Sequence, residues 1–72
     1  MWQEIRKEAG LTQQEMGEKT GYTKDRISQY ECGFRTMPKS LQIEYLKLRN
    51  NEKDKIIIEF LEGEIKNGEN FN

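Results

Sequence analysis

Residues 12–33, TQQEMGEKTGYTKDRISQYECG, decide the fold, because they encode two short helices separated by a glycine turn. Thr12 is a favoured N-cap residue, and Glu15 three positions later completes a capping box. Gly21 suits the left-handed conformation that ends many helices. Thr23 then caps the second helix. Two short helices joined by such a turn predict a helix-turn-helix.

The second of these helices has one apolar and one polar face. Ile27 and Tyr30, three positions apart, turn one face toward a core. The other early positions carry side chains that can hydrogen-bond to a partner: Lys24, Asp25, Arg26, Ser28 and Gln29. In DNA-binding helix-turn-helix proteins, the second helix reads base edges in the major groove. Lys24 can donate to guanine, Gln29 can pair with adenine, and Asp25 can accept from cytosine.

Residues 2–48 resemble the Xre/Cro family, the lambda-type phage repressors and their plasmid and chromosomal relatives. The resemblance is carried by Leu11-Thr12-Gln13, Glu15, Gly21, Thr23, Ile27, Tyr30-Glu31 and Gly33, with Ile5-Arg6 and Ala9-Gly10 upstream and Pro38 to Leu48 downstream. It implies an all-α, five-helix lambda-repressor-like DNA-binding domain. Gly17 departs from the usual alanine, at a cost of about 0.5–1 kcal/mol in helix propensity. Either a close approach of the two helices or simple drift accounts for it.

The resemblance also implies roles for residues outside the second helix. An arginine and a glutamate, here Arg6 and Glu31, form a pair that ties the first helix to the end of the recognition helix. Backbone phosphates would be contacted from both helices and from the loop after them, by Thr12, Gln13, Thr23, Arg35, Thr36 and Lys39. At Thr12 the N-terminal amides and the helix dipole favour an anion.

A fourth helix is expected at about 39–49, with Leu41, Tyr45 and Leu48 on its buried face and Ile43 partly exposed. A fifth is expected at about 52–67, with apolar residues spread over roughly 200° of its circumference. Such a surplus of apolar surface predicts a homodimer interface, formed by Ile57, Ile58, Phe60, Leu61 and Ile65. Deep burial of this helix in the monomer is the alternative. We expect one domain at 1–67 and a flexible tail at 68–72, where Phe71 could dock on a partner.

Composition excludes several functional classes. The 72 residues include one cysteine and no histidine, so disulfides, multi-cysteine metal sites and histidine acid–base catalysis lack their residues. No apolar run approaches the ~18 residues of a membrane span. No carboxylate is placed with a partner nucleophile, and no phosphate-binding glycine loop follows a strand. We therefore expect no enzyme activity, cofactor, small-molecule ligand or membrane partner, and, with the resemblance, a location in the cytoplasm of a bacterial or phage-infected cell.

The formal net charge of −1 is unusual for a DNA-binding protein, so non-specific affinity should be modest. The predicted function is a sequence-specific, dimeric transcriptional regulator of phage, plasmid or mobile-element type that binds an inverted repeat in double-stranded DNA. The chain has no room for a ligand-sensing module, so we expect control by its own concentration. The alternative is a protein-interaction module, such as an antitoxin or anti-repressor. The operator, the sign of regulation and the host remain open.

Overall fold

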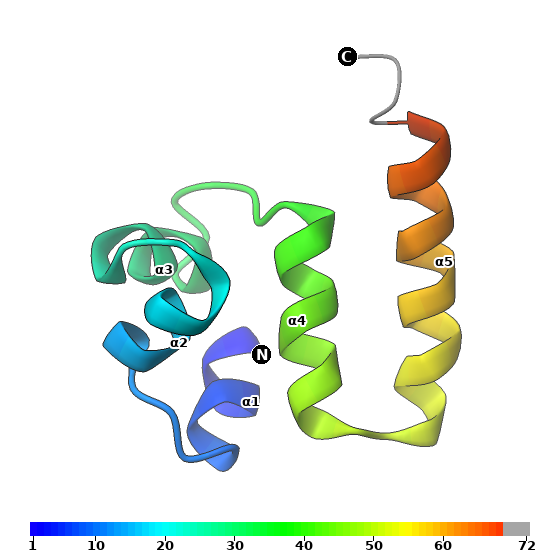
Figure 1. The fold of residues 1–72 in the computed structure, drawn as a ribbon. Coiled ribbons are helices and arrows are strands. Elements are labelled where there is room, and N and C mark those ends of the chain that lie inside the picture. Colours follow the sequence, from blue (N-terminus) through cyan, green and yellow to red (C-terminus); the bar gives the residue numbers. More distant parts are fainter. Residues whose placement is uncertain (69–72) are drawn as a thin grey trace. The chain divides into compact units, whose positions relative to one another are not determined.

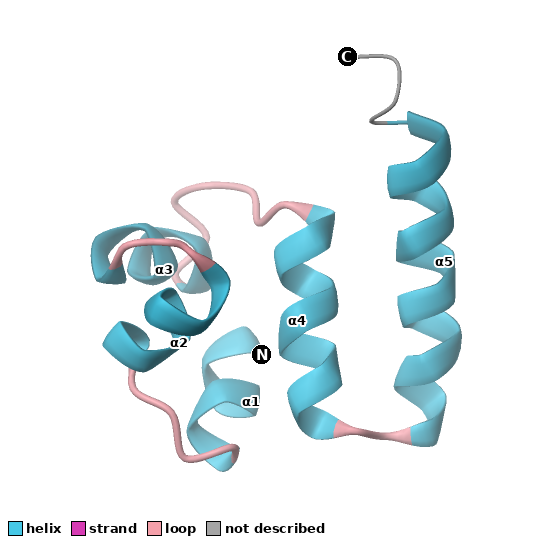
Figure 2. Ribbon diagram, viewed as in Figure 1, coloured by secondary structure: helices cyan, strands magenta, loops and turns pink. Residues whose placement is uncertain are grey.

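The computed structural model describes residues 1–68, with side chains described up to Lys66. It contains the helices α1 (Trp2–Glu8), α2 (Gln13–Thr20), α3 (Lys24–Glu31), α4 (Lys39–Arg49) and α5 (Glu52–Gly68) (Figure 1). Loops join these helices, and residues 1–68 contain no strand (Figure 2). The predicted all-α class with five helices is confirmed. Apart from the end of α5 at Gly68, the expected tail, including Phe71, lies outside the described residues.

The chain forms two compact units, one of residues 1–37 with α1, α2 and α3, and one that begins at residue 38 and contains α4 and α5. In the first unit, the caps predicted from sequence are present. Thr12 Oγ1 accepts from the Glu15 amide at 3.1 Å, and the Glu15 carboxylate accepts from the Thr12 amide at 2.9 Å. Gly21, at φ 85°, ends α2 in the left-handed conformation, and Thr23 Oγ1 caps α3 through the Arg26 amide at 3.1 Å. Local sequence therefore sets the helix-turn-helix.

Gly17 is explained by the close approach of two backbone segments. A Cβ atom at this position would lie 2.5 Å from the carbonyl oxygen of Tyr22, which is well inside van der Waals contact. The amides of Gly21 and Tyr22 both donate to the Gly17 carbonyl, at 2.8 and 3.0 Å, and hold the turn in place. The atoms nearest to this position belong to the backbone of Tyr22 and Thr23. The ring of Tyr22 packs edge-on against Tyr30, with 5.6 Å between ring centroids.

The core differs from the predicted one at several positions. The buried apolar side chains are Ile5, Met16, Ile27, Tyr30 and Met37 in the first unit, and Leu41, Ile43, Tyr45, Leu46 and Leu61 in the second. Leu48, which we expected on the buried face of α4, is half-buried, as are Trp2 and Leu11. The expected exposure of Ile43 is wrong. Ile43 is 6% exposed because α5 covers it, and it lines a groove between α4 and α5 together with Ile65.

Helices α4 and α5 form an antiparallel pair joined by a two-asparagine turn (Figure 1). Asn50, at φ 49°, ends α4, and Asn51 Oδ1 accepts from the Lys53 amide at the start of α5 at 3.0 Å. Arg49 binds the buried carboxylate of Asp54 across the turn, with Nη2–Oδ1 at 2.7 Å. Hydrogen bonds from Arg49 lower the pKa of Asp54 below its ordinary value of 3.8.

We expect the helical pair to lose stability in acid through Asp54. Because the folded pKa is lowered, the stabilisation is present above the unfolded pKa of about 3.9 and is lost as pH falls through the folded pKa. Urea unfolding followed by circular dichroism at about pH 7 and about pH 3 measures this loss. The variant Asp54→Asn should show a smaller loss between the two pH values. An equal loss in both proteins would contradict the assignment.

Candidate nucleic-acid interface

The N-terminal turn of α3 presents an open polar surface. Lys24 and Asp25 are exposed, while Arg26, Ser28 and Gln29 are half-buried. Ile27 and Tyr30, on the opposite face, are 0% and 7% exposed and anchor the helix in the first unit. The five polar residues predicted to read bases therefore differ in solvent exposure, and Lys24 and Asp25 are the most exposed of them.

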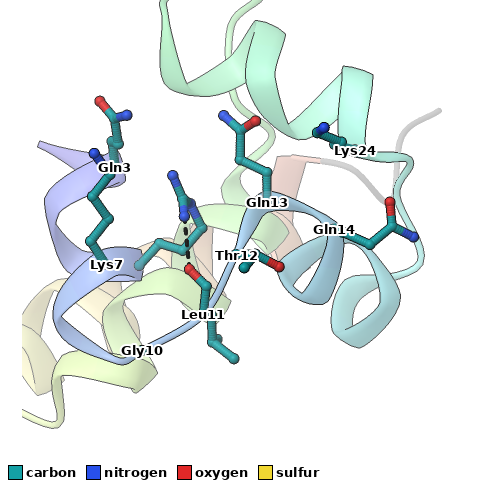
Figure 3. A pocket seen from close by; sticks show the side chains of 9 residues that line it. Gln3, Lys7, Gly10, Leu11, Thr12, Gln13, Gln14 and Lys24 are labelled. Carbon is teal, nitrogen blue, oxygen red and sulfur yellow. Dashed lines mark hydrogen bonds between the residues drawn. The ribbon is translucent and has the colours of Figure 1, made fainter.

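Lys24 borders an open hollow formed by α1, the loop after it and the starts of α2 and α3, and Figure 3 shows the polar side chains arranged around it. Lys7 supplies a second cation, and Gln3, Gln13 and Gln14 supply amide groups. Gln3 and Lys7 were not predicted to be site residues. Their spacing could have indicated a shared surface, because residues four positions apart lie on the same face of a helix. Besides Arg6, which binds Glu31, the hollow combines two lysines with neutral amide donors, which is chemistry suited to a phosphate backbone.

A buried ion pair connects α1 to the end of α3. Arg6 donates to the Glu31 carboxylate through Nε at 2.7 Å and Nη2 at 3.1 Å, and the two side chains are 6% and 3% exposed. Arg6 Nη1 also donates to the Leu11 carbonyl at 2.7 Å. Gln13 Nε2, at the start of α2, donates to Glu31 Oε1 at 3.2 Å. The Glu31 carboxylate thus links α1, α2 and α3, and it fixes the orientation of α3 relative to the other two helices.

The capping box at the start of α2 engages the backbone amide of Thr12, which donates to the Glu15 carboxylate. Hydrogen bonds from Thr12 lower the pKa of Glu15, so this carboxylate stays ionised near neutral pH. A negative charge at this position repels phosphate. The phosphate contact expected for Thr12 and the amides of the first turn of α2 stays a prediction, and the side chains of Gln13 and Lys24 are further donors in this region.

The cations of the loop after α3 and of the start of α4 are engaged within the protein. Arg35 is exposed, and its Nε donates to Gln29 Oε1 at 2.6 Å. Lys39 pairs with Glu64 at 3.2 Å, with both side chains close to half exposed. A surface pair of this kind is worth roughly 0–1 kcal/mol and exchanges readily for another anion. Thr23 and Thr36 are exposed.

The residues predicted for a dimer interface on α5 divide into two groups. Ile57 and Phe60 are 44% and 65% exposed, and Ile56, which we did not select, is 73% exposed. Ile58 and Ile65 are half-buried. Leu61 is 8% exposed, so it belongs to the core of the α4–α5 unit and is removed from the candidate interface. Burial divides the apolar arc of α5 between a core side and an exposed side.

A family model described as helix-turn-helix matches residues 3–44, which is more than half of the chain. The chain belongs to the helix-turn-helix family. The match confirms the predicted Xre/Cro-type relationship and includes α2 and α3 completely. The protein is therefore a DNA-binding helix-turn-helix protein. Comparisons with curated proteins and with solved structures gave no match.

Two further findings concern metal binding and membrane-spanning helices in this helix-turn-helix protein. The part of the chain that the structure describes has no group of three or more Cys, Asp or Glu side chains placed to hold a metal ion. Within the same residues, no helix has the length and apolar character needed to cross a membrane. The family it belongs to is a DNA-binding one and not a family of enzymes.

Proposed function

We propose that this helix-turn-helix protein is a sequence-specific transcriptional repressor that binds an inverted repeat as a homodimer, with α3 in the major groove. The observation that carries the proposal is the exposed start of α3. Lys24 and Asp25 lie there, and Lys24 borders a hollow that is also lined by Lys7. In this arrangement α3 reads base edges while the hollow receives a phosphate of the same groove.

The base contacts proposed for α3 follow from the donors and acceptors of its side chains. Lys24 is the most accessible donor and suits the O6 and N7 acceptors of guanine. Asp25 repels phosphate and is suited to the N4 amino group of cytosine. Arg26 and Ser28 are half-buried and are assigned to the margins of the contact. Phosphates would be contacted by Gln13, Thr23, Thr36 and, after exchange of its partner Glu64, Lys39.

The proposed repressor function is tested by DNA binding as a function of salt. A gel-shift with the DNA upstream of the protein's own gene should show binding that weakens linearly in log–log form as salt rises. Each phosphate contact contributes about 0.9 to the slope, so a dimer with two to four contacts per subunit gives a slope of about −4 to −7. Competition with unrelated duplex DNA is the control. Binding that is insensitive to salt, or equally strong on the competitor, would contradict the proposal.

Dimerisation is proposed through the exposed apolar residues of α5, namely Ile56, Ile57 and Phe60. Large exposed apolar side chains grouped on one helix are typical of an interface. A two-fold dimer would place two α3 helices about 34 Å apart, on one side of the duplex. Repression then follows if the operator overlaps a promoter and excludes polymerase. The proposal includes a location in the cytoplasm of a bacterial or phage-infected cell and a phage, plasmid or mobile-element origin.

The dimer proposal predicts that Phe60→Lys gives a monomer. A charged side chain at the centre of an apolar interface would be desolvated without a partner, which is costly. Light scattering coupled to gel filtration should show a dimer for the unchanged protein and a monomer for the variant. Phe34→Lys is the matched control, because Phe34 is also exposed, at 75%, but lies outside α5. A dimer that survives Phe60→Lys would contradict the proposed interface.

The same apolar surface favours a second candidate function, binding of another protein in the manner of an antitoxin or anti-repressor. An interaction module of that kind has no need of the accessible polar start of α3. The salt titration separates the two candidates, since an interaction module shows no preference for the upstream DNA.

A further inference from the structure

Arg35 and Gln29 are joined both through their side chains and through their backbones. Arg35 Nε donates to Gln29 Oε1 at 2.6 Å, and the Arg35 amide donates to the Gln29 carbonyl at 3.2 Å. The first residue lies in the loop after α3, and the second lies in α3 itself. The loop that follows Gly33, which has φ 83°, therefore turns back along the recognition helix. This contact brings a loop cation to a residue proposed to read a base.

The contact determines which way the Gln29 amide faces. A guanidinium group has five N–H donors and no acceptor, so the amide atom that it approaches at 2.6 Å must be the oxygen. The Gln29 amide oxygen is then held toward Arg35. The pair offers a third group the Nε2 amino group of Gln29, the remaining N–H groups of Arg35 and the second lone pair of the Gln29 oxygen. Donors therefore predominate.

A pair in which donors predominate matches guanine better than adenine. Adenine shows an acceptor, N7, and a donor, the N6 amino group, so a glutamine that reads adenine needs its own oxygen as an acceptor. The Gln29 oxygen already accepts from Arg35, so an adenine amino group would have to reach its second lone pair beside a cationic guanidinium. Guanine shows two acceptors, N7 and O6, and accepts from donors alone.

We infer that Arg35 is a positioning residue that changes the base preference of Gln29 from adenine to guanine. The inference rests on the proposed function, because it assumes that α3 lies in the major groove. It replaces the adenine contact expected for Gln29 from its residue type alone. It also gives Arg35 a role distinct from the phosphate contact expected from its place in the loop.

Selection of binding sites from a randomised duplex library tests the inference with the full-length protein. The unchanged protein should enrich a guanine at one position of each half-site. Arg35→Ala should enrich adenine at that position, and Arg35→Met, which keeps the side-chain length without donors, should do the same. Gln29→Ala should lose the guanine selection there, and Gln29→Ala combined with Arg35→Ala should lose the adenine selection. Exchanging guanine for adenine in the selected site should weaken the unchanged protein about 10-fold and should strengthen Arg35→Ala by a similar factor.

Lys19→Ala is the matched charge control. It removes one exposed cation of the same unit at the end of α2 and should leave every selected base unchanged. If Arg35→Ala and Arg35→Met both keep guanine, or if the unchanged protein selects adenine at the Gln29 position, the inference is overturned while the proposed function stands. If the unchanged protein enriches no sequence at all, both the inference and the proposed function fail.

Discussion

Replacing Glu31 by alanine is expected to lower the free energy of unfolding of the first unit by about 3–5 kcal/mol. The change leaves the Arg6 guanidinium, whose side chain is 6% exposed, as a buried charge without its carboxylate. It also removes the acceptor of Gln13 Nε2. Urea unfolding followed by fluorescence measures the loss, because Trp2 is the one tryptophan of the chain and lies in α1.

The double variant Arg6→Met with Glu31→Leu is the control for this prediction. Replacing a buried ion pair by apolar residues of similar size removes both desolvation costs, so the double variant should be more stable than Glu31→Ala. A loss below about 1 kcal/mol for Glu31→Ala would show that the pair behaves like an exposed one. If the double variant is instead the less stable of the two proteins, the explanation by an unpaired buried charge is wrong.

Replacing both Lys24 and Gln29 by alanine is expected to weaken binding to the preferred site by about 2–6 kcal/mol, or roughly 30-fold to 10⁴-fold. Each residue is proposed to contact a base, and each such contact contributes about 1–3 kcal/mol of discrimination. Fluorescence anisotropy with a labelled duplex, at one fixed salt concentration, measures the affinity. Binding to a random duplex should fall much less, since it depends mainly on phosphate contacts.

Lys47→Ala serves as the charge control for that double variant. Lys47 is an exposed cation on α4, outside the helix-turn-helix, and its removal should leave the preference for the selected site over a random duplex unchanged. If the double variant Lys24→Ala, Gln29→Ala loses less than about threefold in affinity for the preferred site, α3 does not contact the bases. Equal losses of affinity for the preferred and the random duplex would show that both residues contact the DNA backbone and not the bases.

Features set by neighbours in the chain could be predicted from sequence. The caps at Thr12 and Thr23 and the end of α2 at Gly21 depend on contacts within about four residues, where propensity and side-chain chemistry decide. The capping box of Thr12 and Glu15 is one of these features, and its two hydrogen bonds lie within three residues of each other in the chain.

Features set by contacts between distant segments were harder to predict. Ile43 falls outside the apolar stripe of α4 when that helix is considered alone, and it is buried because α5 covers it. Leu61 was assigned to a dimer interface because periodicity locates an apolar face without saying what covers it. The contact of Gln29 with Arg35 depends on the course of the loop after Gly33, which residue spacing does not specify.

The amino-acid sequence by itself determined the helices of this protein, the turn between α2 and α3, and its membership of the helix-turn-helix family. These follow from short-range backbone preferences and from the period of the apolar residues. Only the tertiary structure decided that Gln13 shares the Glu31 carboxylate with Arg6, which side of α5 stays exposed, and which way the amide of Gln29 faces. Those outcomes depend on packing and hydrogen bonding between segments that are brought together by folding, and a single buried acceptor can satisfy only the donors that reach it.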